Sequence, residues 1–350
     1  MSIAAELAAS RTVAVLEREN DLGFHATGRS AAALLESYGS VEIRALTRAS
    51  RALLAAADTA TPLLTPRPLL WIADSLHTDA IADLLAEQPE LGVLAPADAH
   101  AMCPTLRRDN LAAAAVEPGA HDIDVAAVLQ MYVTRASAAG VIIHRSCGVD
   151  RAERADGRWV LHHSSGTLRA DVVVNAAGAW ADDVAARFGA RPCGLQPMRR
   201  TIAIARTERS VSPEWPLVAT VDEGFYFRPE GPNVLISPAD ETPSEPCDAR
   251  PDEADVALAI DRVNRATDMA IRSVVTTWAG LRTFAPDRNP VVGFDPGVPG
   301  LFWLAGQGGY GIQTAPALAQ LAAALICDDA RAAARLGDVD PAHLAPARFG

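Results

Sequence analysis

The chain has 350 residues, 49% of them hydrophobic, and a formal net charge of −12. That length is enough for one large or two interleaved domains with a buried core. The negative balance and the scattered Lys and Arg residues argue against nucleic acid or an anionic membrane as a main partner, so we expect a small-molecule ligand. No apolar run reaches the roughly 18 residues of a transmembrane segment, and we expect a cytoplasmic location.

The cysteine pattern bears on compartment and metal content. The chain has five cysteines, an odd number, and no CxxC pair. They are Cys103, Cys147, Cys193, Cys247 and Cys327. This pattern predicts neither a disulfide framework nor a zinc site, so we expect a reducing compartment and no metal.

The first elements are typical of a nucleotide-binding unit. Residues 3–9 follow a helix pattern, and residues 12–16 (TVAVL) form a continuous apolar run typical of a buried parallel strand. That strand ends on Glu17. An acidic residue at this point of a dinucleotide-binding unit accepts hydrogen bonds from ribose hydroxyls, although a strand-end carboxylate can also simply be solvated.

A glycine-containing turn follows within residues 23–35. Gly28, Arg29 and Ser30 look like a turn that opens a helix. Such a nest of N–H groups can hold a pyrophosphate, and the alternative is a plain helix capped near Ser30. Residues 41–57 then predict an amphipathic helix.

The middle of the chain alternates between strand and helix patterns. We expect a loop leading into an apolar strand over residues 62–74, a helix over 122–139, a strand over 141–144 and a small meander up to His163. The alternation indicates an α/β fold.

Residues 171–180 (DVVVNAAGAW) predict a buried strand that ends in small residues. Among these, Ala177 and Gly178 would let a cofactor or a neighbouring backbone approach closely, and simple packing explains such a turn equally well. Residues 195–235 then change to short alternating strands, followed by a helix over 253–265 and a strand over 273–280. This second pattern predicts a separate antiparallel sheet.

Residues 301–315 (LFWLAGQGGYGIQTA) are the most informative stretch. An apolar strand over 301–305 ends at Gly306, Gly308, Gly309 and Gly311, and a helix pattern runs over 314–326. Glycines at such a turn let a large planar ligand lie against the main chain, and the helix N-terminus suits its electron-rich edge. An ordinary strand-to-helix connection is the alternative.

Six segments, in order along the chain, together resemble the FAD-dependent D-amino-acid oxidase and dehydrogenase (DAO) superfamily. Within it, the likeness is greatest to bacterial D-arginine dehydrogenase-type enzymes. The segments are VLERE (15–19), FHATGRSAA (24–32), VVVNAAGAWAD (172–182), GLQPMRRT (194–201), WAGLRTFAPD (278–287) and GLFWLAGQGGYGIQT (300–314). Each alone is a weak signal, and their common order carries the resemblance.

The resemblance implies an α/β fold of two domains and a non-covalently bound FAD. A discontinuous Rossmann-like FAD-binding domain would comprise residues 1–60, 125–190 and 285–335. A substrate domain with an antiparallel sheet would comprise residues 61–124 and 191–284, and residues 336–350 would form a C-terminal tail. The implied reaction oxidises the Cα–N bond of a D-amino acid by hydride transfer to flavin N5. Water then converts the imino acid to a 2-oxo acid and ammonia, and oxygen or a quinone reoxidises the flavin.

The resemblance also assigns substrate-site residues. Arg282 matches the arginine that binds the substrate carboxylate, and Arg200 matches a second arginine of the same pocket. Tyr226 would donate its hydroxyl to the carboxylate, and Tyr38 would lie near the substrate entry. Gly309 would offer its carbonyl to the substrate amine. Without the resemblance, either arginine is more typically a surface or ion-paired residue, and either tyrosine a half-buried core residue.

A longer set of residues would hold the cofactor. The matching positions are Glu17, Arg18, Gly28, Arg29, Ser30, Val149, Ala177, Gly178, Gly306, Gly308, Gly309, Tyr310, Gly311, Ile312, Gln313 and Thr314.

Two departures from the D-arginine enzymes concern the substrate. Leu69 stands where those enzymes carry an acidic residue for a cationic side chain, and Ala33 replaces an active-site histidine. A guanidinium against leucine would be left unpaired, so we expect a neutral or apolar substrate. The alternatives are a glycine or sarcosine oxidase-like enzyme and a non-catalytic remnant that binds a small ligand or a partner protein.

A third departure concerns the first strand of the family fold. The family opens with a strand and a G-x-G-x-x-G loop, and the match here begins just after the last glycine. The absent strand would be central, so its neighbours would be left with unpaired edges. Either the natural protein is longer or this is a shortened, flavin-poor protein. We favour the first because the downstream cofactor elements are mutually consistent.

Overall fold

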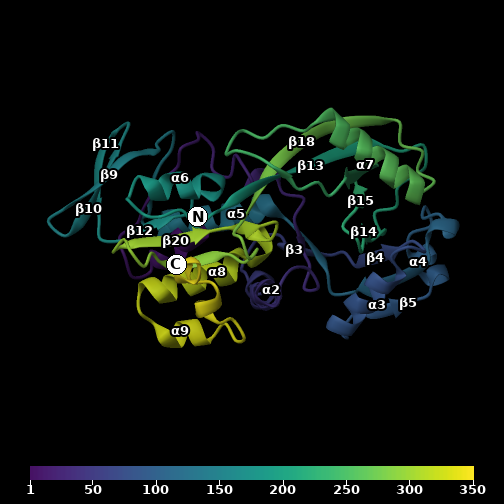
Figure 1. The fold of residues 1–350 in the computed structure, drawn as a ribbon, viewed down its shortest axis with the longest axis horizontal. Coiled ribbons are helices and arrows are strands. Elements are labelled where there is room, and N and C mark those ends of the chain that lie inside the picture. Colours follow the sequence, from purple (N-terminus) through teal and green to yellow (C-terminus); the bar gives the residue numbers. More distant parts are fainter.

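Two long strands join the two parts of this elongated molecule. The computed structural model describes residues 1–350. One part contains both chain termini, and the other carries most of a large antiparallel sheet (Figure 1). Strands β13 (Gln196–Arg206) and β18 (Ser273–Phe284) pair along their length and run from the first part into the second (Figure 1).

The structure has nine α-helices. Their bounds are α1 Ser2–Leu7, α2 Val41–Ala55, α3 Thr78–Glu87, α4 Pro96–Met102, α5 Val125–Ala138, α6 Ala181–Ala186, α7 Glu253–Ala266, α8 Gly311–Ile326 and α9 Ala330–Ala334. Side-chain oxygens cap the N-termini of α2, α5 and α7, which satisfies N–H groups that a helix cannot pair internally. No helix is both long and apolar enough to cross a membrane.

The parallel sheet of the first part is in two pieces. Strand β1 (Ala14–Leu16) pairs in parallel with β8 (Ile142–His144). Strand β12 (Val173–Asn175) pairs in parallel with β20 (Leu301–Ala305), which also pairs with β19 (Val291–Phe294). No strand joins β1 to β12, so each of them pairs along one edge only. The parallel strands therefore form two separate sheets and not one continuous sheet.

Two smaller sheets flank this part. The predicted meander is confirmed as β9 (Val149–Ala155), β10 (Arg158–His163) and β11 (Gly166–Ala170), and it projects at one end of the molecule (Figure 1). A second sheet joins β2 (Ala33–Leu34) and β3 (Leu64–Pro66) through the central strand β7 (His121–Ile123).

The large sheet has ten strands in the order β21-β18-β13-β16-β15-β14-β4-β6-β5, with β17 on β13. All neighbours are antiparallel except β14 and β4. The remaining bounds are β4 Leu69–Ala73, β5 Gly92–Leu94, β6 Ala113–Glu117, β14 Leu217–Thr220, β15 Tyr226–Glu230, β16 Asn233–Ser237, β17 Thr242–Pro243 and β21 Gln307–Gly308. The antiparallel sheet predicted from residues 195–235 is therefore confirmed, and it also recruits β4–β6.

Each of the two parts has its own cluster of buried apolar side chains. In the first part, the Ala/Leu face of α8 packs on Phe302 and Leu304 of β20 and on Ile3 and Leu7 of α1. In the second part, α4 and α7 cover one face of the large sheet, where Phe227, Ile236 and Met269 are fully buried. Each such side chain contributes roughly 1.5–3 kcal/mol by leaving water.

Three local predictions are wrong. No helix follows Ser30, whose ψ of 135° is extended, because Ala33 and Leu34 instead pair with β7 while Leu34 is buried. Residues 122–123 belong to β7, so the helix predicted from 122 begins at Val125. Helix α8 begins three residues before the predicted start, because Gly311, the last glycine of the cluster, is already its first residue.

Candidate active site

Three of the four tyrosines in the chain surround one arginine. Tyr38, Tyr226 and Tyr310 all lie close enough to Arg282 to change the pKa of its guanidinium. The rings of Tyr38 and Tyr310 are 5.0 Å apart between centroids. Burial alone would lower the pKa of Arg282, but the three phenol groups raise it above its usual value. Arg282 is thus a permanent cation in this pocket.

The register of the large sheet places Arg282. It lies on β18 opposite Met198 of β13, and Arg200 follows two residues along β13. Because side chains on a strand alternate between faces, all three lie on the same face of the sheet. Tyr226 is the first residue of β15, Tyr38 precedes α2, and Tyr310 immediately precedes α8. Four segments far apart in sequence therefore converge on one pocket.

Two polar atoms of this pocket are buried without a hydrogen-bond partner. They are Nη1 of Arg282 and the hydroxyl of Tyr226. Leaving such groups unpaired costs roughly 1–3 kcal/mol each, more for a charged group. Both atoms are donors, so the ligand that satisfies them must be an acceptor and preferably an anion. A carboxylate meets this requirement.

The glycine-rich turn packs directly against Arg282. A Cβ atom on Gly309 would lie 2.9 Å from Cζ of Arg282, so only glycine leaves the guanidinium in place. Gly306 and Gly308 have φ of 69° and 54°, the left-handed region that glycine favours. The predicted bare-backbone turn is present and forms one wall of the pocket.

Arg200 lies beside the pocket but is already engaged. It is 4% exposed, its Nε donates to the carbonyl of Asp240 at 2.7 Å, and its Nη2 lies 3.5 Å from Glu241. Its guanidinium is 5.9 Å from the centroid of the Tyr226 ring. Arg200 therefore supports the Tyr226 side of the pocket, and direct contact with a substrate remains a prediction.

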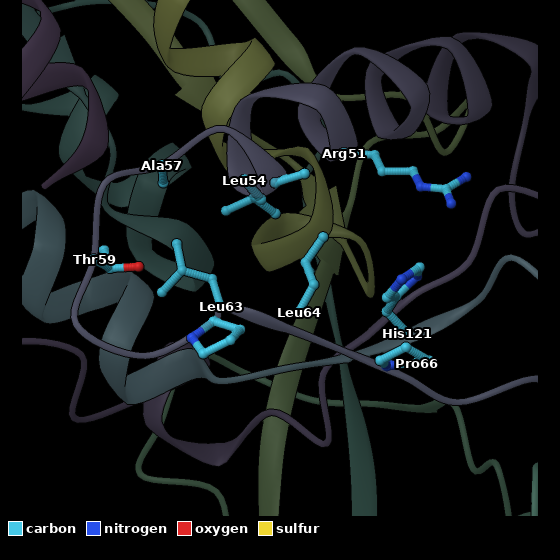
Figure 2. Close-up of a pocket in the computed structure, with 10 residues that line it drawn as sticks. Arg51, Leu54, Ala57, Thr59, Leu63, Leu64, Pro66 and His121 are labelled. Carbon is cyan, nitrogen blue, oxygen red and sulfur yellow. The ribbon is translucent and has the colours of Figure 1, made fainter.

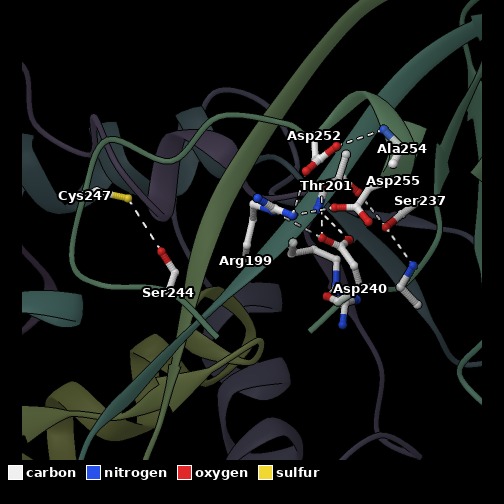
Figure 3. Close-up of polar contacts among 11 residues, drawn as sticks. Arg199, Thr201, Ser237, Asp240, Ser244, Cys247, Asp252, Ala254 and Asp255 are labelled. Carbon is white, nitrogen blue, oxygen red and sulfur yellow. Dashed lines mark hydrogen bonds and ion pairs between the residues drawn. The ribbon is translucent and has the colours of Figure 1, made fainter. Parts of the chain in front are cut away.

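The neighbouring Arg199 points to the opposite face of β13. It lies 2.8 Å from Asp255 and 3.7 Å from Asp252, and Thr201 donates to Asp240 close by (Figure 3). These contacts tie the N-terminus of α7 to β13. Neither here nor elsewhere do His, Cys, Asp and Glu side chains form a group that could hold a metal ion.

The start of α8 meets the requirements for holding a flavin ring. Tyr310 is the N-cap residue and provides no side-chain cap, which leaves N–H groups of the first turn to a ligand or water. Of the predicted cofactor residues here, Gln313 uses its amide on Leu35 and Thr47, and the hydroxyl of Thr314 bonds the Tyr310 carbonyl. The backbone N–H of Thr314 also donates to the Tyr310 carbonyl, so the predicted cofactor contacts of these two residues stay predictions.

The predicted adenosine-binding residues also gather in one place. The N–H of Cys147 donates to the Glu17 carbonyl at 2.8 Å, which places residues 147–149 beside the end of β1. A Cβ atom on Gly148 would lie 3.8 Å from Arg18, and the Arg18 guanidinium is 4.9 Å from the centroid of the Trp180 ring. Glu17, Arg18 and Val149 are thus brought together.

The third predicted set of cofactor residues, Ala177 and Gly178, is separated from Trp180 by one residue. Gly178 has a φ of 57°, and a Cβ atom built on it meets no protein atom within 4 Å. The end of β12 therefore leaves open space beside the adenosine-binding residues.

The Gly28–Ser30 turn has a different environment. A Cβ atom on Gly28 would lie 2.5 Å from the Gly23 carbonyl oxygen, so glycine is required. Arg29 donates to the carbonyls of Ala249 and Ala279 at 2.9 and 3.2 Å, and it pairs with Asp248. The Arg29 side chain thus ties the two parts together, and the predicted cofactor contacts of this turn stay predictions.

Two cavities are present near these elements, but neither is lined by Arg282 or by its three tyrosine neighbours. One of about 210 Å³ is bounded by Met198, Phe284 and Arg288, beside the wall formed by the glycine turn. Another of about 480 Å³ lies between α2 and β3, where Leu54, Leu63 and His121 line it (Figure 2). No residue predicted for the site lines either of these two cavities.

Sequence reasoning missed two buried residues behind Tyr38. Glu117 and Gln88 both hydrogen-bond to the segment that carries Tyr38. Neither residue lies in a recognisable motif, so no local signal marks them.

These features fit an FAD cofactor. The uncapped helix start and the glycine wall suit the flavin ring, and buried donors without partners, on Arg282 and Tyr226, lie nearby. Together with a parallel sheet joined to a large antiparallel sheet, they define a two-domain flavoprotein oxidoreductase.

Comparison with known proteins specifies the family. Residues 1–325 match the family model DAO, described as "FAD dependent oxidoreductase". The chain therefore belongs to the DAO family of FAD-dependent oxidoreductases, and its cofactor is FAD.

Relatives with a known activity are similar over part of the chain. Mitochondrial dimethylglycine dehydrogenase of Rattus norvegicus is 26% identical over 242 residues, which is 63% of this chain but 28% of that protein. Glycine oxidase of Geobacillus kaustophilus is 28% identical over 237 residues, 67% of this chain and 61% of that protein. The chain thus spans only part of these relatives in the matched regions.

Solved structures share the fold. The crystal structure of L-proline dehydrogenase from P. horikoshii has a TM-score of 0.87 at 19% identity and covers 99% of this chain and 94% of that one. That of glycine oxidase from Geobacillus kaustophilus has a TM-score of 0.85 at 24% identity, covering 98% and 94%. The predicted two-domain α/β fold is confirmed.

Proposed function

We propose that this protein oxidises the Cα–N bond of a small neutral or apolar amino acid, with FAD as the electron acceptor. A D-amino acid is the leading substrate class. The product would be an imino acid, which water hydrolyses to a 2-oxo acid and ammonia. Bound FAD supplies a two-electron acceptor for the hydrogen on Cα.

One observation carries the proposal. The buried Nη1 of Arg282 and the Tyr226 hydroxyl lack partners, and both lie in a pocket whose wall is the glycine turn expected to hold the flavin. A substrate carboxylate would satisfy both donors. Its Cα would then be fixed relative to the turn, and the Gly309 carbonyl would be available to accept a hydrogen bond from the amine. Such positioning is the main task left to the protein in this chemistry.

The side-chain region of the pocket supports a neutral substrate. Leu69 is fully buried in an apolar cluster against which Ala33, Tyr38 and Tyr226 pack. A cationic substrate side chain would meet this apolar wall unpaired, at a cost of several kcal/mol. This is the reason to prefer apolar over basic amino acids and to doubt D-arginine itself.

A second candidate is oxidation of glycine or an N-methylated glycine. Glycine oxidase and dimethylglycine dehydrogenase are among the relatives with a known activity, and L-proline dehydrogenase shares the fold. The carboxylate requirement is the same for both candidates, so Arg282 would have the same role. They differ in whether the substrate carries a side chain on Cα.

The test is anaerobic reduction of the protein reconstituted with FAD. D-alanine, D-leucine, D-arginine, glycine, sarcosine and L-proline would each be added, and the loss of oxidised-flavin absorbance followed. We expect the neutral D-amino acids to reduce the flavin fastest. Reduction by N-methyl glycines alone would replace the leading candidate by the second, and no reduction by any amine would overturn the proposal.

A further inference from the structure

The segment that carries Tyr38 is held in place by side chains from other elements. This segment, residues 35–39, connects β2 to α2 and belongs to no strand or helix. Gln313 bonds both backbone groups of Leu35, and Arg44 donates to the carbonyl of Gly39 at 3.0 Å. Its ends are therefore fixed by α8 and α2. The middle of the segment, next to Tyr38, is held differently.

Glu117 holds the middle of the Tyr38 segment. It is the last residue of β6 and is 6% exposed. Its Oε1 accepts from the backbone N–H of Glu36 at 2.6 Å, and its Oε2 accepts from the backbone N–H and the hydroxyl of Ser37. One carboxylate thus satisfies three donors on the two residues that precede Tyr38.

The Glu117 carboxylate is buried without a neighbouring cation. Glu117 forms no ion pair, and burial raises the pKa of its carboxyl group despite the hydrogen bonds from Ser37 and Glu36. Two further buried groups bind the same residue: Trp71 donates to the Ser37 hydroxyl at 3.2 Å and Gln88 donates to the Ser37 carbonyl at 2.8 Å. A buried network of this kind specifies one conformation of the backbone it holds.

The conformation so specified places Tyr38 in the pocket. From it, the Tyr38 ring packs 5.0 Å from the ring of Tyr310 and its hydroxyl lies beside the guanidinium of Arg282. In this segment the Glu117 carboxylate contacts Glu36 and Ser37 and not Tyr38 itself. Its influence on Tyr38 would therefore pass through these two residues.

We propose that Glu117 is a positioning residue for substrate binding, which sets Tyr38 against Arg282 through its hydrogen bonds to Glu36 and Ser37. The expected effect on substrate binding rests on the proposed function. The expected effect of Glu117 on the conformation of residues 35–39 does not depend on any activity.

The test uses Glu117→Gln in the full chain reconstituted with FAD. Glutamine has the same shape but one acceptor oxygen fewer, so it cannot accept from all three donors. We expect KM for the amino acid to rise about tenfold with a much smaller change in kcat, consistent with losing one charge-assisted hydrogen bond. In a Tyr38→Phe background, the same substitution should have almost no further effect on KM, because coupled residues are not additive.

Amide hydrogen exchange provides the second readout. Exchange at residues 36 and 37 should be faster in Glu117→Gln than in the wild type, whether or not the protein oxidises any amine. Asp252→Asn is the matched control, because Asp252 also accepts from a backbone N–H, at the start of α7 and away from this segment. It should change neither KM nor exchange at these two residues.

The outcomes separate this inference from the proposed function. An unchanged KM, an equal KM effect in the Tyr38→Phe background, or unchanged exchange at residues 36 and 37 would overturn the role of Glu117. Absence of amine oxidation in the wild type would instead overturn the proposed function. If Glu117→Gln fails to fold, Ser37→Ala removes one of the same donors and should show the same KM effect and the same coupling to Tyr38.

Discussion

The guanidinium of Arg282 lies against the backbone of Gly309, and a Cβ atom at that position would come within 2.9 Å of Cζ and of Nη1. Gly309 does not adopt a left-handed φ, so the requirement for glycine here is steric. The same contact places the cation of the pocket next to the turn that is expected to hold the flavin. In the proposed function, the carboxylate site and the flavin site would therefore meet at these two residues.

Gly309→Ala should weaken substrate binding by displacing Arg282. We expect KM to rise about tenfold or more, because the shift disturbs a charge-assisted contact worth roughly 1.5–3 kcal/mol. Gly297→Ala is the matched control, since Gly297 is in an exposed turn with room for a Cβ atom. Steady-state kinetics of the two variants are the measurement. The same KM in Gly309→Ala as in Gly297→Ala would mean that Arg282 does not bind the substrate in the position described.

The two arginines of the pocket should differ in importance. Arg282→Lys removes the fork that can bind a carboxylate with two hydrogen bonds, so KM should rise about a hundredfold. Arg200→Lys should have a smaller effect on KM and a larger one on stability, because Arg200 already bonds the Asp240 carbonyl and faces Glu241. Kinetics and urea unfolding of both variants distinguish these roles. A larger KM effect at Arg200 would reverse the assignment.

Tyr226→Phe should reduce binding without reducing stability. The hydroxyl is buried and unpartnered in the free protein, so its removal should leave the free energy of unfolding unchanged or raise it by up to about 1 kcal/mol. KM should rise about fivefold to tenfold, because the substrate loses one donor. Tyr132→Phe, at a buried tyrosine outside the pocket, is the control for removing a phenol group. A stability loss without a change in KM would show that Tyr226 is structural.

The C-terminal residues should show acid-dependent stability through Asp287 and Arg348. Burial alone would raise the pKa of Asp287, but hydrogen bonds from Arg348 and from the N–H of Asn289 lower it below its usual range. A lowered pKa in the folded state gives stability that is present above the unfolded value of about 4 and lost as the pH falls through the folded value. Asp287→Asn should therefore be less stable than wild type near about pH 7, with the difference shrinking below about pH 4. A difference that grows on acidification would contradict this sign.

The main features of the fold could be predicted from the sequence because their signals are local. The apolar run of β20, the glycine cluster and the Ala/Leu pattern of α8 follow one another directly, and the structure contains that strand, turn and helix. The alternating pattern after residue 195 likewise became the antiparallel sheet. The helix predicted after Ser30 is wrong because Ala33 and Leu34 form a short strand. Their conformation is determined by pairing with β7 and not by their own propensity.

The pocket could be predicted only through the family resemblance. Arg282 and Tyr226 carry no local mark of function, and their pairing depends on the register of a sheet that spans most of the chain. Glu117 was missed for the same reason, since it acts on Glu36 from 81 positions away. Buried polar contacts of this kind are tertiary, and no periodicity reports them.

The most direct test of the central claim compares two amines that differ only in the carboxylate. D-alanine and ethylamine would each be mixed anaerobically with the FAD-reconstituted protein, and the rate of flavin reduction measured for the wild type and for Arg282→Ala. We predict that D-alanine reduces the wild-type flavin far faster than ethylamine and that the advantage disappears in Arg282→Ala. Equal rates for the two amines in the wild type, or a D-alanine advantage that survives in the variant, would contradict the assignment of this pocket as a carboxylate site.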